Sequence, residues 1–253
     1  MRYFAELSYN GTNYVGWQNQ PNGIAVQAKI EAALSTILRE DIAIVGCGRT
    51  DAGVHAKQYF IHFDVEQAIM DNLTYRINKF LPKDIAFKRF IPVKDNAHAR
   101  FDATNRGYEY HIEYYKNPHK TDTAYFYPFA HQLDMKLLQE SAKLLIDYDE
   151  FFPFCKAHSD AKTMCCEVRE CYWTLDEEHD HLVFRIAADR FLRGMVRLIV
   201  GMCLNVALHK IPLETVKAAM DNQTRLEKSL SVPAHGLYSV SYTHLTLPTI
   251  CSV

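Results

Sequence analysis

The stretch Gly46-Cys47-Gly48-Arg49-Thr50-Asp51-Ala52-Gly53-Val54-His55-Ala56 places one carboxylate, Asp51, in a short loop that holds three glycines. The apolar run 42–45 precedes this loop and the alternating segment 59–63 follows it, so the pattern predicts two strands joined by a turn. Glycine allows the backbone conformations of a tight turn, which presents its acid outward. A plain turn, with Thr50 or Asp51 bonded to its own backbone, explains the same residues.

Outward from this loop, the first half of the chain alternates between strand and helix patterns. The order strand-helix-strand-strand-helix-strand is that of a ferredoxin-like unit. We expect strands at 2–9, 42–47, 58–63 and 85–90, and helices at 26–39 and 69–80.

The second half repeats this order without a repeat at the level of residues. We expect strands at 107–115, 168–175, 182–188 and 237–242, and helices at 135–146, 191–207 and 213–220. The predicted fold class is therefore α+β, with two ferredoxin-like (βαββαβ) halves whose sheets join edge to edge into a continuous antiparallel or mixed sheet. We expect the helices to lie on one side of this sheet.

The predicted domains are 1–104, which carries the Asp51 loop, and 105–242, the second ferredoxin-like half. The last segment, 243–253, has no charged residue apart from a histidine that could be protonated, and neither caps a helix nor extends a clear strand. We expect this tail to be foreign sequence and leave it out of the fold prediction.

Composition bounds the class of protein. A chain of 253 residues with 48% hydrophobic and 23% charged residues is typical of a soluble globular protein. The segment 1–7 is charged and alternating, unlike a signal peptide, and no apolar run is long enough to span a bilayer, so we expect a cytoplasmic protein without a membrane partner. Seven cysteines without regular spacing fit reduced thiols.

The net charge of −2 gives no general signal for nucleic-acid binding, but phosphate contacts need only a local patch. Two basic groups qualify, and each is equally consistent with a solvated face. The first consists of Arg185, Arg190, Arg193 and Arg197, and the second of Lys79, Lys83, Lys88 and Arg89.

Several familiar chemistries are not supported. The Gly46-x-Gly48 pair lacks the third glycine and the following helix of a dinucleotide-binding fingerprint. Phosphate-binding P-loops, serine nucleophile elbows and His-Glu-x-x-His motifs are absent from the sequence. The spacing of Cys155, His158, Cys165, Cys166 and Cys171 matches no common zinc module, so we expect no metal site.

Three further segments combine polar, aromatic and basic residues. Segment 10–20 is a polar loop in which Trp17 either serves a site or plugs the core. Segment 97–110 interleaves arginines and aromatics, a composition suited to stacking bases and holding phosphates. In segment 191–201, an apolar helix is expected to carry Arg193 and Arg197 one turn apart, where a buried arginine needs an anionic partner.

Taken together, these motifs resemble the tRNA pseudouridine synthase A family. They occur in the family's order and cover nearly the whole chain up to about Tyr238. The matching motifs are Phe4–Thr12, Gly16-Trp17-Gln18, Val26-Gln27, Gly48–Ala56, Ala97-x-Ala99-Arg100-Phe101, Tyr108-x-Tyr110 and Phe191-Leu192-x-x-Met195-Val196-Arg197-x-Ile199-Val200-Gly201.

The resemblance implies isomerisation of uridine to pseudouridine at positions 38–40 of the tRNA anticodon stem-loop, in a central RNA-binding cleft. It implies that Asp51 is the nucleophile, that Tyr108 stacks on the target base with a possible part in proton transfer, and that Arg197 pairs with Asp51. It also implies a homodimer with tRNA lying across both subunits, and no cofactor, because the reaction includes neither a redox step nor group transfer to another molecule. The expected substrate-binding residues are Arg49, Thr50, His55, Gln18, Arg100, Phe101 and Arg193.

Two alternatives remain at this stage. A non-catalytic RNA-binding protein of the same fold would keep Tyr108, Arg193 and Arg197 but would not need Asp51. A glycoside or nucleoside hydrolase with Asp51 as nucleophile would normally need a second carboxylate as general acid, and no paired acid accompanies the motif.

Overall fold

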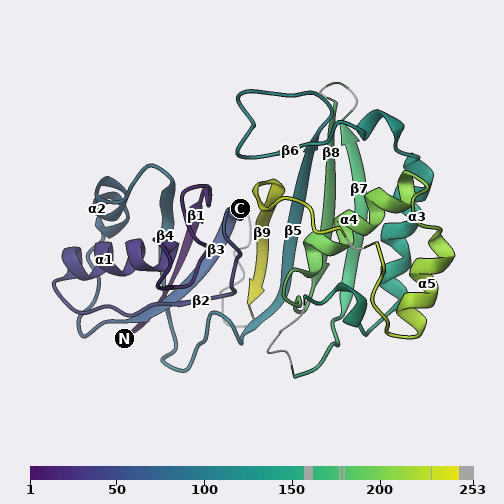
Figure 1. Ribbon diagram of the computed structural model, residues 1–253. Helices are drawn as coiled ribbons and strands as arrows, with labels where there is room; N and C mark the ends of the chain where they lie inside the picture. Colours follow the sequence, from purple (N-terminus) through teal and green to yellow (C-terminus); the bar gives the residue numbers. More distant parts are fainter. Residues whose placement is uncertain (157–161, 177, 179, 229, 245–253) are drawn as a thin grey trace, which may run out of the picture. The chain divides into compact units, whose positions relative to one another are not determined.

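The computed structural model describes residues 1–156, 162–176, 178, 180–228 and 230–244. Across these residues five α-helices and nine strands form an α+β fold, as predicted (Figure 1). The chain divides into two compact units. Among the described residues, unit 1 consists of 1–105 together with 239–244, and unit 2 consists of those between 106 and 238.

Unit 1 follows the predicted order of elements. Its strands β1, β3 and β4 pair antiparallel in the order β4-β1-β3, and β2 pairs antiparallel with β3. This arrangement, with β1 between β3 and β4, is that of a split βαβ unit. The elements are β1 (Arg2–Tyr9), α1 (Val26–Leu38), β2 (Val45–Gly46), β3 (His55–Asp64), α2 (Leu73–Phe80) and β4 (Ile85–Val93).

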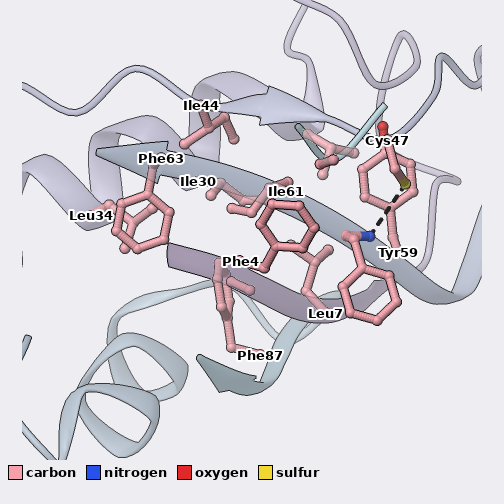
Figure 2. Packing of buried hydrophobic residues seen from close by; sticks show 14 of the residues in the cluster. Phe4, Leu7, Ile30, Leu34, Ile44, Cys47, Tyr59, Ile61, Phe63 and Phe87 are labelled. Atoms are coloured by element: carbon pink, nitrogen blue, oxygen red, sulfur yellow. Dashed lines mark hydrogen bonds between the residues drawn. The ribbon is translucent and has the colours of Figure 1, made fainter. Parts of the chain in front are cut away.

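The core of unit 1 forms where α1 packs on β1 and β3. Ile30 and Leu34 lie one turn apart on α1, and both are fully buried against Phe4, Ile61 and Phe63 (Figure 2). Apolar residues one turn apart on the helix and at alternate positions on the strands therefore meet in the same core layer.

Glu6 is a buried acid in β1 whose side chain is 4% exposed. Burial alone would raise the pKa of this carboxyl, but hydrogen bonds from Gln58, Arg89 and Lys88 outweigh it and hold the pKa below its ordinary value. Two members of the second basic group, Lys88 and Arg89, thus neutralise an acid of the sheet.

The predicted strand 42–47 is reduced to the two residues of β2. The N–H of Ile42 donates to Ser35 Oγ at 2.9 Å, and the N–H of Ile44 donates to Glu31 Oε1 at 3.2 Å. Side chains of α1 therefore accept hydrogen bonds from backbone N–H groups that would pair with a neighbouring strand if this segment were a longer strand.

In unit 2, β5, β7 and β8 pair antiparallel in the order β5-β8-β7, and the short β6 pairs parallel with β5. Helix α3 packs against α4 and β7 and has the N-cap Asp134, whose side chain accepts from the N–H groups of Lys136 and Leu137. The strands are β5 (Ala103–Glu113, beginning at the end of unit 1), β6 (Tyr125–Phe126), β7 (Val168–Asp176) and β8 (His181–Ala188); the α-helices are α3 (Met135–Lys143), α4 (Met195–Ala207) and α5 (Leu213–Asp221); short 3-10 helices span Ala130–Gln132, Leu144–Asp147, Phe152–Phe154 and Ala234–Gly236.

Two predicted helices begin later than expected. The helix predicted for 69–80 starts at Leu73, and the helix predicted for 191–207 starts at Met195. The residue before α4, Gly194, has φ of +72°, a left-handed conformation that ends any helix entering from Phe191.

The last strand, β9 (Leu237–His244), extends two residues past the predicted end at Tyr242. Thr104 Oγ1 donates to Thr243 O, and the buried His244 ring bonds to Ala99 O at 2.7 Å. The first two residues of the predicted tail are therefore part of a strand, and residues 245–253 lie outside the described residues. None of the helices in the described ranges is long and apolar enough to cross a membrane.

Candidate active site

The Asp51 loop connects β2 and β3 in unit 1, as the sequence predicts. Asp51 is half-buried, and its carbonyl accepts from the N–H of Val54 at 3.2 Å, which closes a tight turn. Arg49 in the same loop is exposed. The loop thus gives the carboxylate access to solvent while its backbone is fixed.

Segment 10–20 packs directly against this loop. The N–H of Trp17 donates to Thr50 O at 3.2 Å, and the N–H of Gly11 donates to His55 Nδ1 at 3.0 Å. Gly16 has φ of +113°, and a Cβ placed on it would lie 2.6 Å from Thr50 O, so no other residue fits here without displacing the loop.

Three aromatic side chains support the loop from within unit 1. Trp17 is 3% exposed and packs on Tyr59 with ring centroids 4.2 Å apart, so it does fill the core. Tyr59 OH donates to Gly48 O, and Tyr9 OH shares a 2.8 Å hydrogen bond with Thr50 Oγ1.

The other predicted binding residues of the loop region differ in exposure. Gln18 is exposed, whereas His55 is 1% exposed and its Nδ1 is occupied by Gly11. Since Nδ1 accepts a hydrogen bond from the backbone N–H of Gly11, this ring nitrogen carries no proton of its own.

Segment 97–102 presents an aromatic ring to solvent. Phe101 is 75% exposed; its ring stacks on His98 at a centroid distance of 4.2 Å, and the Arg100 guanidinium lies 5.9 Å from the ring centroid. The N–H groups of Arg100 and Phe101 both donate to His98 Nδ1 at 3.2 Å, which fixes the turn that exposes the ring.

In unit 2, Tyr108 lies in β5 opposite Ile186 of β8 and is 9% exposed. Its ring meets that of Phe191 edge to face, with centroids 5.2 Å apart. The predicted Tyr108 strand and the segment that leads into α4 are therefore neighbours.

Arg197 lies in the first turns of α4 and is half-buried. Its Nε donates to Val232 O at 2.7 Å, and Tyr110 OH donates to the next carbonyl, Pro233 O, at 2.8 Å. Burial raises the pKa of Tyr110 far above its usual range, although the nearby charge of Arg197 acts in the opposite sense. Arg197 and Tyr110 thus hold the same segment.

The predicted pairing of Arg193 and Arg197 on one helix face is wrong. Arg193 precedes the left-handed Gly194 and lies outside α4, where it is exposed and its carbonyl accepts from Lys156 N–H at 3.1 Å. Within the same basic group, Arg185 is engaged by Glu109.

The cysteine-rich segment contains buried thiols. Burial raises the pKa of Cys166 to about 12 and that of Cys171 well above its ordinary value, so neither is a thiolate at neutral pH. Among the residues that the structure describes, no three His, Cys, Asp or Glu side chains are grouped to hold one metal ion; His158 lies outside that set.

Sequence reasoning missed Tyr9 and Tyr59, which bond to the loop although they belong to the alternating strand patterns on either side of it. A usable signal exists: both are tyrosines at positions where packing alone requires only an apolar ring, and a buried phenol needs a hydrogen-bond partner.

Comparison with known proteins covers both units. A family model described as tRNA pseudouridine synthase matches residues 5–102 and 147–243, which include Asp51 and Arg197, while Tyr108 lies between the matched segments. The chain is 43% identical to tRNA pseudouridine synthase A of Azobacteroides pseudotrichonymphae over 94% of each chain, and 44% identical to that of Parabacteroides distasonis over 96% of each. It is 36% identical to that of Bacillus subtilis over 94% of this chain and 97% of the relative. This chain therefore belongs to the tRNA pseudouridine synthase family.

Proposed function

We propose that this protein isomerises uridine to pseudouridine in tRNA, with Asp51 as the nucleophile. The observation that carries the proposal is the family match across both units, joined to a loop that fixes Asp51 while leaving its side chain half-exposed. We further propose positions 38–40 of the anticodon stem-loop as the target.

The chemistry breaks the C1′–N1 bond of the nucleotide, turns the uracil and forms a C1′–C5 bond. The hydrogen on C5 is lost, and N1 gains a proton. The target base must first leave the helical stack, at a cost of a few kcal/mol. A carboxylate is a suitable nucleophile for a reaction that proceeds through a covalent intermediate. The reaction includes neither a redox step nor group transfer to another molecule, so we propose that it needs no cofactor.

We assign Tyr108 to the target base and Arg197 to the Asp51 carboxylate. Tyr108 is held by Phe191, and the Arg197 side chain is anchored through Nε to Val232 O. An arginine paired with a nucleophilic carboxylate favours the ionised form, which is the form that attacks.

The remaining predicted binding residues are proposed to contact the RNA around the base. Exposed aromatic rings stack on bases, and arginines beside them contact phosphates, which fits Phe101 with Arg100. Arg49 and Gln18 are exposed beside the Asp51 loop, and Arg193 is exposed before α4. The roles of Thr50 and His55 as binding residues remain proposals of the same kind.

Tritium release from tRNA that carries uridine labelled at C5 tests the proposal, because the C5 hydrogen leaves when the new bond forms. We expect wild-type protein to release tritium, and Asp51→Asn to release at least about 10³-fold less, as expected for loss of a nucleophile. Asp71→Asn, which alters an exposed acid in the turn before α2, is the matched control and should keep the wild-type rate.

An unchanged rate in Asp51→Asn would overturn the nucleophile assignment. Binding of tRNA without any tritium release by wild-type protein would favour the non-catalytic RNA-binding alternative instead. A tRNA with cytidine at positions 38–40 should lose its label release if those positions are the target.

We propose that the enzyme works as a cytoplasmic homodimer with tRNA across both subunits. The support is the family resemblance. Light scattering of the purified protein should give twice the mass of one chain, with a monomeric mass as the contrary result, and fractionation of the native host should recover the protein with the cytosol.

A further inference from the structure

Three buried aromatic residues lie together beneath the Asp51 loop. Tyr9 ends β1, Trp17 lies in the loop between β1 and α1, and Tyr59 lies in β3; they are 4%, 3% and 0% exposed. The Tyr59 ring centroid lies 4.2 Å from that of Trp17 and 5.6 Å from that of Tyr9. We refer to Tyr9, Trp17 and Tyr59 as the aromatic platform.

Each member of the aromatic platform bonds to the loop that carries Asp51. Tyr59 OH donates to Gly48 O and lies 3.4 Å from Gly48 N–H, which donates to it. The backbone N–H of Trp17, rather than its indole, donates to Thr50 O at 3.2 Å. Tyr9 OH pairs with Thr50 Oγ1 at 2.8 Å, so both the backbone and the side chain of the residue before Asp51 are held.

Packing alone does not account for the two phenols. A phenylalanine fills the same apolar space, whereas a buried hydroxyl is costly unless it is hydrogen-bonded. Both hydroxyls find their partners on the loop: Tyr59 bonds to Gly48, 11 positions away in sequence, and Tyr9 bonds to Thr50, 41 positions away.

We infer that Tyr9 is a positioning residue for the reaction: it fixes the position of the Asp51 carboxylate by holding Thr50, while Tyr59 holds the same side of the loop two residues earlier, at Gly48. The inference rests on the proposed function, since it takes Asp51 to be the nucleophile. Side chains locked on strands hold a reacting group in place without ordering it anew in each turnover, and an error of about 1 Å can cost up to about 10²-fold in rate.

Steady-state tritium release at varied tRNA concentration tests this role. We expect Tyr9→Phe and Thr50→Val each to lower kcat by about 5- to 100-fold. In Tyr9→Phe, which changes a buried residue outside the proposed RNA contacts, KM for tRNA should stay within about twofold of wild type. The double variant should be no slower than the slower single variant, because both remove the same hydrogen bond. Thr50→Ser keeps the hydroxyl and should restore most of kcat.

Two matched controls remove equivalent hydroxyls elsewhere. Tyr148 OH donates to Asp221 Oδ1 at 2.7 Å, and Thr36 Oγ1 donates to Ala32 O within α1. Tyr148→Phe and Thr36→Val should keep the wild-type kcat. Thermal unfolding of every variant shows whether it is folded at the assay temperature.

Wild-type kcat in Tyr9→Phe, an effect on KM alone, or additive losses in the double variant would each overturn the inference. If Thr50→Val does not fold, the comparison of Tyr9→Phe with Thr50→Ser decides. The two proposals fail separately: full activity of Asp51→Asn removes the proposed function and this inference with it, whereas an inactive Asp51→Asn beside a fully active Tyr9→Phe removes this inference only.

Discussion

At the scale of single residues, two buried histidines of β3 fix neighbouring segments through the same atom. His55 Nδ1 accepts from Gly11 N–H, and His62 Nδ1 accepts from Ala99 N–H at 3.1 Å. Both bonds require an unprotonated Nδ1. For His62, burial, with smaller effects of the charges of His98 and Arg2, lowers the pKa to about 4.

This shift predicts an acid-dependent loss of stability. Because the folded-state pKa of His62 is below its unfolded value of about 6.5, the unfolded chain binds the proton more readily. The contribution of the neutral, buried His62 to the free energy of unfolding is therefore complete above about pH 6.5. It is lost as the pH falls toward 4, by at most about 3 kcal/mol. Urea unfolding at pH 7.5 and pH 5.0 should show that His62→Asn, whose amide oxygen can still accept from Ala99, depends less on pH than wild type. Equal pH dependence in both proteins would contradict the shift.

At the scale of elements, helix α4 has one glycine directly before it and one within it, and backbone conformation and packing, rather than helix propensity, explain both. Its apolar periodicity is evident in the sequence, but its start is set by the left-handed Gly194. Inside the helix, Gly201 approaches the chain at Leu230 so closely that a Cβ would lie 1.8 Å from Leu230 O. The segment that follows, at Val232, is also the one that anchors Arg197.

Gly201→Ala is accordingly predicted to destabilise unit 2 although alanine is the better helix former. The gain in helix propensity is up to about 1 kcal/mol, and the forced separation of α4 from Leu230 costs about 1–3 kcal/mol or more. Chemical denaturation should give a lower free energy of unfolding for this variant. Lys217→Ala, an exposed substitution in α5, is the control and should change stability by less than about 0.5 kcal/mol. A stabilised Gly201→Ala would show that the close approach is not maintained.

At the scale of the whole molecule, the chain returns to unit 1 with its last described strand. Ser239 Oγ donates to Gln58 O, and Tyr242 N–H donates to Gln58 Oε1. The rings of Tyr242 and His244 meet those of Tyr59 and Phe60 edge to face. Unit 1 is thus built from segments at both ends of the sequence.

A chain that ends at Tyr238 should therefore lose stability in unit 1 more than in unit 2. The two tryptophans make this measurable, since Trp17 lies in unit 1 and Trp173 in unit 2. In a Trp173→Phe background, where Trp17 reports on unit 1, the midpoint temperature of thermal unfolding followed by fluorescence should be several degrees lower for the shortened chain than for the full chain. In a Trp17→Phe background, where Trp173 reports on unit 2, the midpoint temperature should change less. Equal shifts in both backgrounds would refute the assignment of the part of β9 from Ser239 onward to unit 1.

The elements that carry most of the candidate site residues were predictable because these residues lie in short motifs. The Asp51 loop falls between two strands as expected, and Arg197 falls on the expected helix. The position of Arg193 outside α4 was not predictable from apolar spacing. The helical spacing of apolar residues continues through Gly194, but the helical backbone conformation is interrupted there. His55 stands in a polar motif, and its burial follows from its contact with Gly11, 44 residues earlier.

The sequence by itself determined the α+β class, the order of elements in both halves and the position of the acid loop, because periodicity and glycine placement are local properties. Only the tertiary structure decided that Ile42 and Ile44 bond to side chains of α1, that α4 starts at Met195, and that the Tyr9 hydroxyl meets Thr50. These outcomes depend on hydrogen bonds and packing between residues far apart in the chain, where a donor or an apolar surface has several possible partners and the folded backbone brings only one of them within reach.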